Sequence, residues 1–135
     1  MVIVLKRETL FLGAEDDIVR ARQYVRQWAM QVGFTLIEQT KLVTAVSELA
    51  RNTVVHGGGG QALLEEVDGR NRRGIRLTFT DRGPGISDLA LAMRDGYTSG
   101  KGLGLGLGGA KRLVNEFDIV STPGQGTTVR IVKWK

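Results

Sequence analysis

The stretch Gly100–Gly109, "GKGLGLGLGG", holds six of the chain's 19 glycines in ten residues. A glycine inside a helix or strand costs about 0.5–1 kcal/mol relative to alanine, because its backbone loses more freedom on folding. Such a dense cluster indicates an unusual backbone path or a ligand that approaches the main chain. Gly102, Gly104 and Gly106 alternate with leucines, and a helical pattern follows directly. Exposed N–H groups and a helix N-terminus suit phosphate groups, and Lys101 adds a cation.

Two familiar phosphate motifs do not match this stretch. No Gly-Lys-Ser/Thr closes it, as a Walker P-loop requires, and a loop rather than a strand precedes it, unlike a Rossmann fingerprint. The alternative is a flexible loop with incidental glycines. The leucines at every second position count against that alternative because they keep the segment apolar.

Composition limits the class of protein. The chain has 135 residues, 41% of them apolar, and no apolar run near the roughly 20 residues that span a bilayer, so we expect one soluble domain over residues 1–135 with no membrane contact. No cysteine is present, which fits a reducing cytoplasm, and the single histidine excludes multi-histidine metal sites. The net charge of +5 suits nucleotide phosphates, an acidic protein or nucleic acid, but only 6% of residues are aromatic, which argues against nucleic-acid binding.

Apolar periodicity predicts an alternation of strands and helices. After an N-terminal strand we expect helices at Ala14–Val32 and Ile37–Val55, a hairpin of Ala62–Val67 with Ile75–Thr80, a short helix at Ile86–Arg94, a helix at Leu105–Phe117, and two final strands that turn at Pro123 and Gly124. This order predicts an α+β two-layer sandwich, in which one mixed β-sheet carries helices on one face.

The second predicted helix ends in "SELARNTVVHG", where Glu48, Asn52 and His56 are spaced at four. This spacing places them along one helix edge, beside the apolar row that includes Leu49 and Thr53. The carboxylate can orient a hydroxyl or a water, and the amide oxygen can bind a hard cation such as Mg²⁺. The alternative is a solvated helix edge with His56 in the cap.

Two further motifs follow predicted strands. In "DRGPGI", Asp81 can accept a hydrogen bond from the amino group of a base, while Gly83 and Gly85 keep side chains away from a flat ligand. A plain turn is the alternative. In "GQGTT", the hydroxyl of Thr127 or Thr128 at a strand start could reach the same base edge as Asp81.

In this order, "ELARN", "DRGPG", "GLGLGL" and "GQGTT" resemble the N box and the three glycine boxes of the GHKL (Bergerat-fold) ATPases, over residues 48–128. The short lid and the glutamate that opens the N box resemble the anti-sigma-factor serine kinases. Within them, "TAVSELARN", "GLGLGLGGAKRLVNEFDI" and "VKWK" are most similar to the stressosome switch kinases of the RsbT type.

The resemblance implies a Bergerat ATP-binding fold and a role for each motif residue. Asn52 would help to bind Mg²⁺ at the ATP phosphates, Glu48 would be the base toward the attacking hydroxyl, and Asp81 would bind the adenine amino group. The remaining contacts to ATP would come from Gly83, Gly85, Lys101, Gly102, Gly104, Gly106, and Thr127 or Thr128.

The resemblance also implies an activity: a protein-serine/threonine kinase that phosphorylates STAS-domain proteins of a stressosome and then activates a PP2C-type phosphatase. Histidine autophosphorylation is disfavoured, because Glu48 stands where histidine kinases usually carry Asn and the helix with a phospho-acceptor histidine is missing. Two alternatives stay open: an anti-sigma factor kinase that binds a sigma factor directly, and a nucleotide-binding partner-switch module without catalysis.

Overall fold

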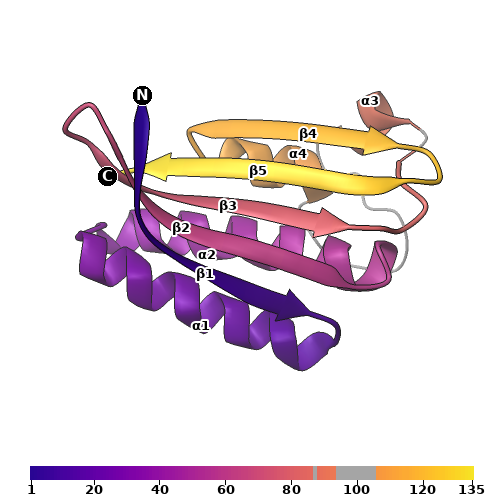
Figure 1. The fold of residues 1–135 in the computed structure, drawn as a ribbon, viewed down its shortest axis with the longest axis horizontal. Coiled ribbons are helices and arrows are strands. Elements are labelled where there is room, and N and C mark those ends of the chain that lie inside the picture. Colours follow the sequence, from indigo (N-terminus) through magenta and orange to yellow (C-terminus); the bar gives the residue numbers. More distant parts are fainter. Residues whose placement is uncertain (87, 94–105) are drawn as a thin grey trace.

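The computed structural model describes residues 1–86, 88–93 and 106–135, and Figure 1 shows their arrangement. Along the chain lie β1 (Val2–Leu12), α1 (Glu15–Val32), α2 (Leu36–Arg51), the π-helical turn η1 (Asn52–His56), β2 (Gly60–Gly69), β3 (Arg73–Asp81), α3 (Leu89–Ala92), α4 (Gly106–Arg112), β4 (Glu116–Thr122) and β5 (Gly126–Trp134). The predicted order of strands and helices is confirmed. No helix of this described part is long and apolar enough to cross a membrane.

The five strands form one sheet in the order β1-β2-β3-β5-β4. Every neighbouring pair is antiparallel, so the α+β class is confirmed, but the expectation of a mixed sheet is wrong. The reason is the number of helices in the first crossover. A single helix between two strands brings the chain back so that the second strand runs parallel to the first. The two helices α1 and α2 reverse the chain direction one more time, so β2 runs antiparallel to β1. β4 runs in the same direction as β3, but β5 lies between them.

Helices α1 and α2 lie on the same side of the sheet (Figure 1). The apolar periodicity that predicted the two helices is confirmed. Ile18, Val25 and Trp28 of α1 are buried, and so are Leu42, Ala45, Val46 and Leu49 of α2. They pack against the inward-facing side chains of the sheet, among them Leu64, Leu77 and Ile131.

The other face of the sheet carries a buried charge. Glu65 of β2 is only 4% exposed, and its carboxylate binds Arg76 of β3 at 2.9 Å and Arg7 of β1 at 3.7 Å. The two arginines lie on the strands at either side of β2 in the sheet. This ion pair network therefore links three strands on the face that α1 and α2 leave uncovered.

Three helices differ from the prediction, and one of them, α3, covers only Leu89–Ala92 of the expected Ile86–Arg94. α2 is α-helical only to Arg51 and continues as the wider turn η1 to His56, where the prediction had a regular helix to Val55. α4 ends at Arg112 rather than at Phe117. There the main-chain N–H of Asn115 donates to the Val132 carbonyl at 3.0 Å, and its side-chain oxygen accepts from the Trp134 N–H at 2.7 Å, so pairing with β5 replaces the helix.

Candidate functional site

The predicted site residues come from five elements, α2, η1, β3, α4 and β5, whose ends meet at one end of the sheet. α2 and η1 carry Glu48 and Asn52, β3 ends at Asp81, and α4 begins at Gly106. β5 begins beside the end of β3, because the two strands pair antiparallel with Thr80 opposite Thr128. Lys101, Gly102 and Gly104 lie outside the described residues.

The N-box helix and the glycine-rich segment are in direct contact. The main-chain N–H of Gly106 donates a long hydrogen bond of 3.4 Å to Oε2 of Glu48, although 58 residues separate them. Both residues are at least half-buried. A carboxylate therefore lies at the point where the described part of the glycine-rich stretch begins.

Glu48 and Asn52 lie one helical turn apart, as predicted, because the Asn52 N–H donates to the Glu48 carbonyl. His56 follows a different geometry. The Gly57 N–H donates to the Asn52 carbonyl at 2.9 Å, which closes the wider i to i+5 turn of a π-helix. The α-helical spacing that predicted a common edge for all three residues thus holds only for the first two. Single π-turns inside helices occur frequently at functional sites.

Asp81 is held in a defined orientation. Its Oδ1 accepts hydrogen bonds from the main-chain N–H groups of Gly83 at 2.9 Å and Thr127 at 3.2 Å. The structure thus brings together Asp81 and Thr127, which are 46 residues apart, as the motifs predict. Thr128 is the neighbour of Thr127 on a strand, so its side chain points to the opposite face of the sheet.

Gly83 and Gly85 have a packing reason to be glycine that the sequence interpretation missed. A Cβ on Gly83 would lie 2.7 Å from the Cα of Gly57. Gly85 has φ +76°, in the left-handed region, and a Cβ there would overlap the Thr122 carbonyl oxygen. Gly83 therefore lets the loop after β3 pack against Gly57 beside Asp81, and Gly85 lets it pack against the end of β4. Their contact with a flat ligand stays a prediction.

Ser121 of β4 joins the site without belonging to any motif. Its Oγ accepts from the Ile86 N–H at 2.7 Å and lies 2.8 Å from the Thr127 hydroxyl. It therefore ties the loop after β3 to the start of β5. The signal that could have found it is the register of the last hairpin, which places Ser121 opposite Thr127.

The donor atoms beside Asn52 suit Mg²⁺. An amide oxygen and the carboxylate of Glu48 are hard oxygen donors, which Mg²⁺ prefers. Within the described ranges, no group of three or more His, Cys, Asp or Glu residues is placed to hold a metal ion. The residues therefore fit a Mg²⁺ ion that takes most of its ligands from phosphates and water, the usual arrangement at nucleotide sites.

Comparison with known proteins agrees with the motifs. Residues 12–133 match the histidine kinase-like ATPase domain family. The chain is 44% identical over 120 residues to the serine/threonine-protein kinase RsbT of Bacillus subtilis, and the alignment covers 89% of this chain and 90% of the relative. It is 32% identical over 135 residues to the anti-sigma F factor of Pasteuria penetrans, and that alignment covers 95% of this chain and 89% of the relative.

A solved structure supports the fold. The chain superposes with a TM-score of 0.66 and 20% identity on the crystal structure of the RsbU and RsbW domains of Rv1364c from Mycobacterium tuberculosis. The match covers 97% of this chain and 33% of the other, so our chain spans about a third of that protein. These findings confirm the resemblance that the four boxes indicated: the chain belongs to the histidine kinase-like ATPase domain family.

Proposed function

We propose that this protein is a serine/threonine kinase that transfers the γ-phosphate of ATP to a protein hydroxyl. The observation that carries the proposal is the pair of Glu48 and Asn52, with the Glu48 carboxylate bonded to the Gly106 N–H. In this proposal the base lies one helical turn from a cation-binding amide, and it is hydrogen-bonded to Gly106, the last of the glycines expected to meet phosphates. Similarity to a serine/threonine-protein kinase along most of both chains supports it.

In this proposal the chain's residues bind ATP and move one proton. Asp81 accepts a hydrogen bond from the adenine amino group, and Thr127, the one of the two threonines beside Asp81, completes the contacts to the base. Gly83 and Gly85 line the base, and Lys101, Gly102, Gly104 and Gly106 meet the phosphates. Mg²⁺ held by Asn52 supplies charge neutralisation when bound.

The transfer step needs positioning and one base. The substrate hydroxyl oxygen forms a bond to the γ-phosphorus as the bond from that phosphorus to the β,γ-bridging oxygen breaks, and ADP leaves. The hydroxyl proton passes to the Glu48 carboxylate. All of these steps take place in one domain of 135 residues.

The finer part of the proposal concerns partners. The substrate is a serine or threonine of a STAS-domain protein in a cytoplasmic stressosome, and the released kinase then activates a PP2C-type phosphatase. The similarity to RsbT supports a serine/threonine kinase activity. The assignment of the STAS-domain protein, the stressosome and the phosphatase as partners rests on the resemblance of the sequence motifs.

The test is incubation of the full chain with Mg²⁺, γ-labelled ATP and a purified STAS-domain protein. We expect label on the substrate, and loss of at least about 100-fold in rate for Glu48→Ala, because general bases contribute about 10²–10⁴-fold. Asn52→Ala should lose labelling as well. Thr40→Val is the matched control, since Thr40 is exposed on the same helix. Unchanged labelling in both site variants, with folding verified by circular dichroism, would refute the assigned roles.

A second candidate is an anti-sigma factor, which the similarity to anti-sigma F factors favours. Such a protein would hold a sigma factor directly as well as phosphorylate its antagonist. Pull-down of purified sigma factors and STAS-domain proteins by the immobilised chain separates the two candidates. Firm sigma-factor binding would select the second candidate over the first.

A further inference from the structure

We infer that Gly57 is a positioning residue that fixes the Asp81 carboxylate for recognition of the adenine base. Gly57 lies directly after η1 and is the last residue of "SELARNTVVHG", but it is not one of the residues to which the motifs assigned a ligand contact. The inference rests on the proposed ATP-binding function, and it assigns base recognition to a main-chain contact between two distant loops.

The backbone of Gly57 does not itself require glycine. Its φ is −85° and its ψ is −10°, in the right-handed region that all residues adopt. The need for glycine must therefore come from what a side chain would meet.

That obstacle is the Asp81 side chain. A Cβ on Gly57 would overlap the Cγ of Asp81 and lie 2.6 Å from both its Cβ and its Oδ2. The Cβ of Asp81 is fixed by the end of β3, so rotation of the carboxylate alone cannot relieve the contact. A side chain at Gly57 has to displace Asp81 as a whole.

Gly57 cannot move aside without cost, because two contacts hold it. Its N–H donates to the Asn52 carbonyl at 2.9 Å, which anchors it to the π-turn. On another side, Gly83 packs so closely that a Cβ there would lie 2.7 Å from the Gly57 Cα. The other oxygen of Asp81, Oδ1, is held as well, because it accepts from the N–H groups of Gly83 and Thr127. We call the contacts of Gly57, Gly83 and Thr127 around the Asp81 carboxylate the clamp.

The clamp determines which base is accepted. A carboxylate held in place accepts a hydrogen bond from the amino group of adenine, whereas guanine presents a carbonyl oxygen at that position and would be repelled. Hydrogen bonds to charged groups are among the stronger ones and depend on geometry. Displacement of Asp81 should therefore weaken ATP binding and reduce the preference for ATP over GTP.

The experiment compares the unmodified chain with Gly57→Ala and the matched control Gly58→Asn. Gly58 is the next residue, a Cβ there meets nothing within 4 Å, and its φ of +72° is one that asparagine tolerates. Calorimetry with Mg²⁺ and either ATP or GTP gives the two dissociation constants. NMR of the nucleotide-free protein gives the amide shifts of Gly83 and Thr127, which report the Oδ1 bonds.

For Gly57→Ala we expect ATP affinity to fall about tenfold or more, GTP affinity to change little, and both amide signals to move. Gly58→Asn should match the unmodified chain in all three measurements. Retained ATP affinity and preference, or unmoved amide signals, would overturn the inference. Global unfolding of Gly57→Ala, with Gly58→Asn folded, would overturn it too, since Gly57 would then serve the fold.

The same experiment distinguishes failure of the proposed function from failure of the role of Gly57. If the unmodified chain binds neither nucleotide, the proposal of an ATP-dependent kinase is refuted, and the assignment of Gly57 to adenine recognition falls with it. If the unmodified chain binds ATP and Gly57→Ala binds it equally well, only the inference about Gly57 is refuted.

Discussion

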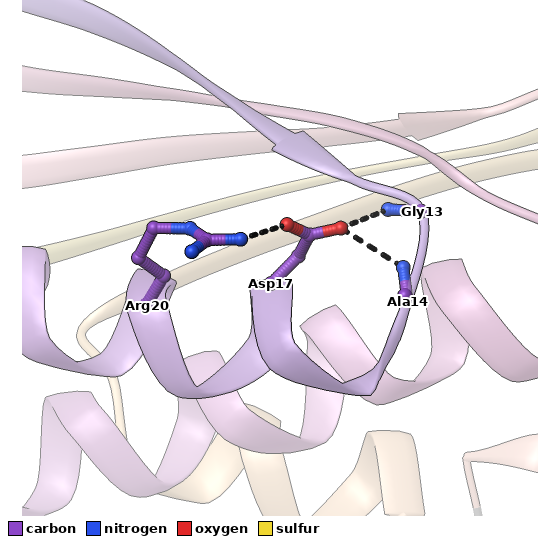
Figure 2. A network of polar contacts seen from close by, with 4 residues as sticks. All are labelled: Gly13, Ala14, Asp17 and Arg20. Carbon is purple, nitrogen blue, oxygen red and sulfur yellow. Dashed lines mark hydrogen bonds and ion pairs between the residues drawn. The ribbon is translucent and has the colours of Figure 1, made fainter.

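Asp17 fixes the turn between β1 and α1 through main-chain contacts. Figure 2 shows one carboxylate oxygen accepting from the N–H groups of Gly13 and Ala14, while the other oxygen binds Arg20. The two main-chain bonds are 2.9 Å long and the contact with Arg20 is 2.6 Å. The hydrogen bond from Arg20, then the one from Gly13, hold the pKa of Asp17 below its usual value. The ionised side chain therefore stabilises the folded state.

We expect Asp17→Ala to lower the midpoint of thermal unfolding at pH 7. Since the folded-state pKa lies below the unfolded value of 3.8, the stabilisation is present above about pH 4 and is lost as the pH falls through the folded pKa. The difference between the variant and the unmodified chain should accordingly shrink in acid. Asp16→Ala is the control, because Asp16 is also in the first turn of α1. An equal effect of both variants at all pH values would contradict this role.

At the scale of elements, the change from α-helix to π-turn after Arg51 decides where Asn52 and Gly57 lie. Thr53, in this turn, is 3% exposed and donates its hydroxyl to the Leu49 carbonyl at 3.0 Å. Thr40 makes the same i to i−4 bond to Leu36 at 3.0 Å, but on the exposed side of α2. The two threonines differ chiefly in burial.

We therefore expect Thr53→Val to lower the free energy of unfolding by about 1 kcal/mol, since a buried carbonyl loses its hydroxyl partner. Thr40→Val should stay within about 0.5 kcal/mol of the unmodified chain, because water replaces the lost bond. Urea denaturation followed by circular dichroism measures both. A larger loss for Thr40→Val than for Thr53→Val would show that the hydroxyl of Thr53 is not needed at the π-turn.

At the scale of the whole molecule, Lys133 of β5 lies between the sheet and α2. It is 6% exposed and is paired across the sheet with Ile75, a core residue. Burial lowers the pKa of Lys133, Glu38 opposes this effect, and Lys41 adds to it. The charged ammonium is therefore less favourable in the folded chain than in the unfolded chain.

Lys133→Met should raise the urea midpoint at pH 7. The cost of burying the ammonium is present below the folded pKa of Lys133 and disappears as the pH rises through that pKa toward the unfolded value of 10.5. The gain from methionine should accordingly be smaller at pH 10 than at pH 7. Lys135→Met serves as the control, because Lys135 is exposed. A destabilised Lys133→Met protein at pH 7 would contradict the expectation.

The sequence by itself determined the order of strands and helices, the buried faces of α1 and α2, and the end of a strand at Asp81. These features follow from periodicity and turn residues, which are local properties of the chain. The four boxes also indicated the family, because their residue types and order are read directly from the sequence.

Only the tertiary structure decided the antiparallel pairing throughout the sheet, the π-turn at Asn52, the choice of Thr127 as the neighbour of Asp81, and the contacts of Gly57 and Ser121. Each depends on the register of strands or on contacts between segments far apart in the sequence. A turn such as "DRGPG" shows which residues are near Asp81 along the chain. The contact between the main chain of Gly57 and the Asp81 carboxylate forms only when α2, β3 and β5 pack together.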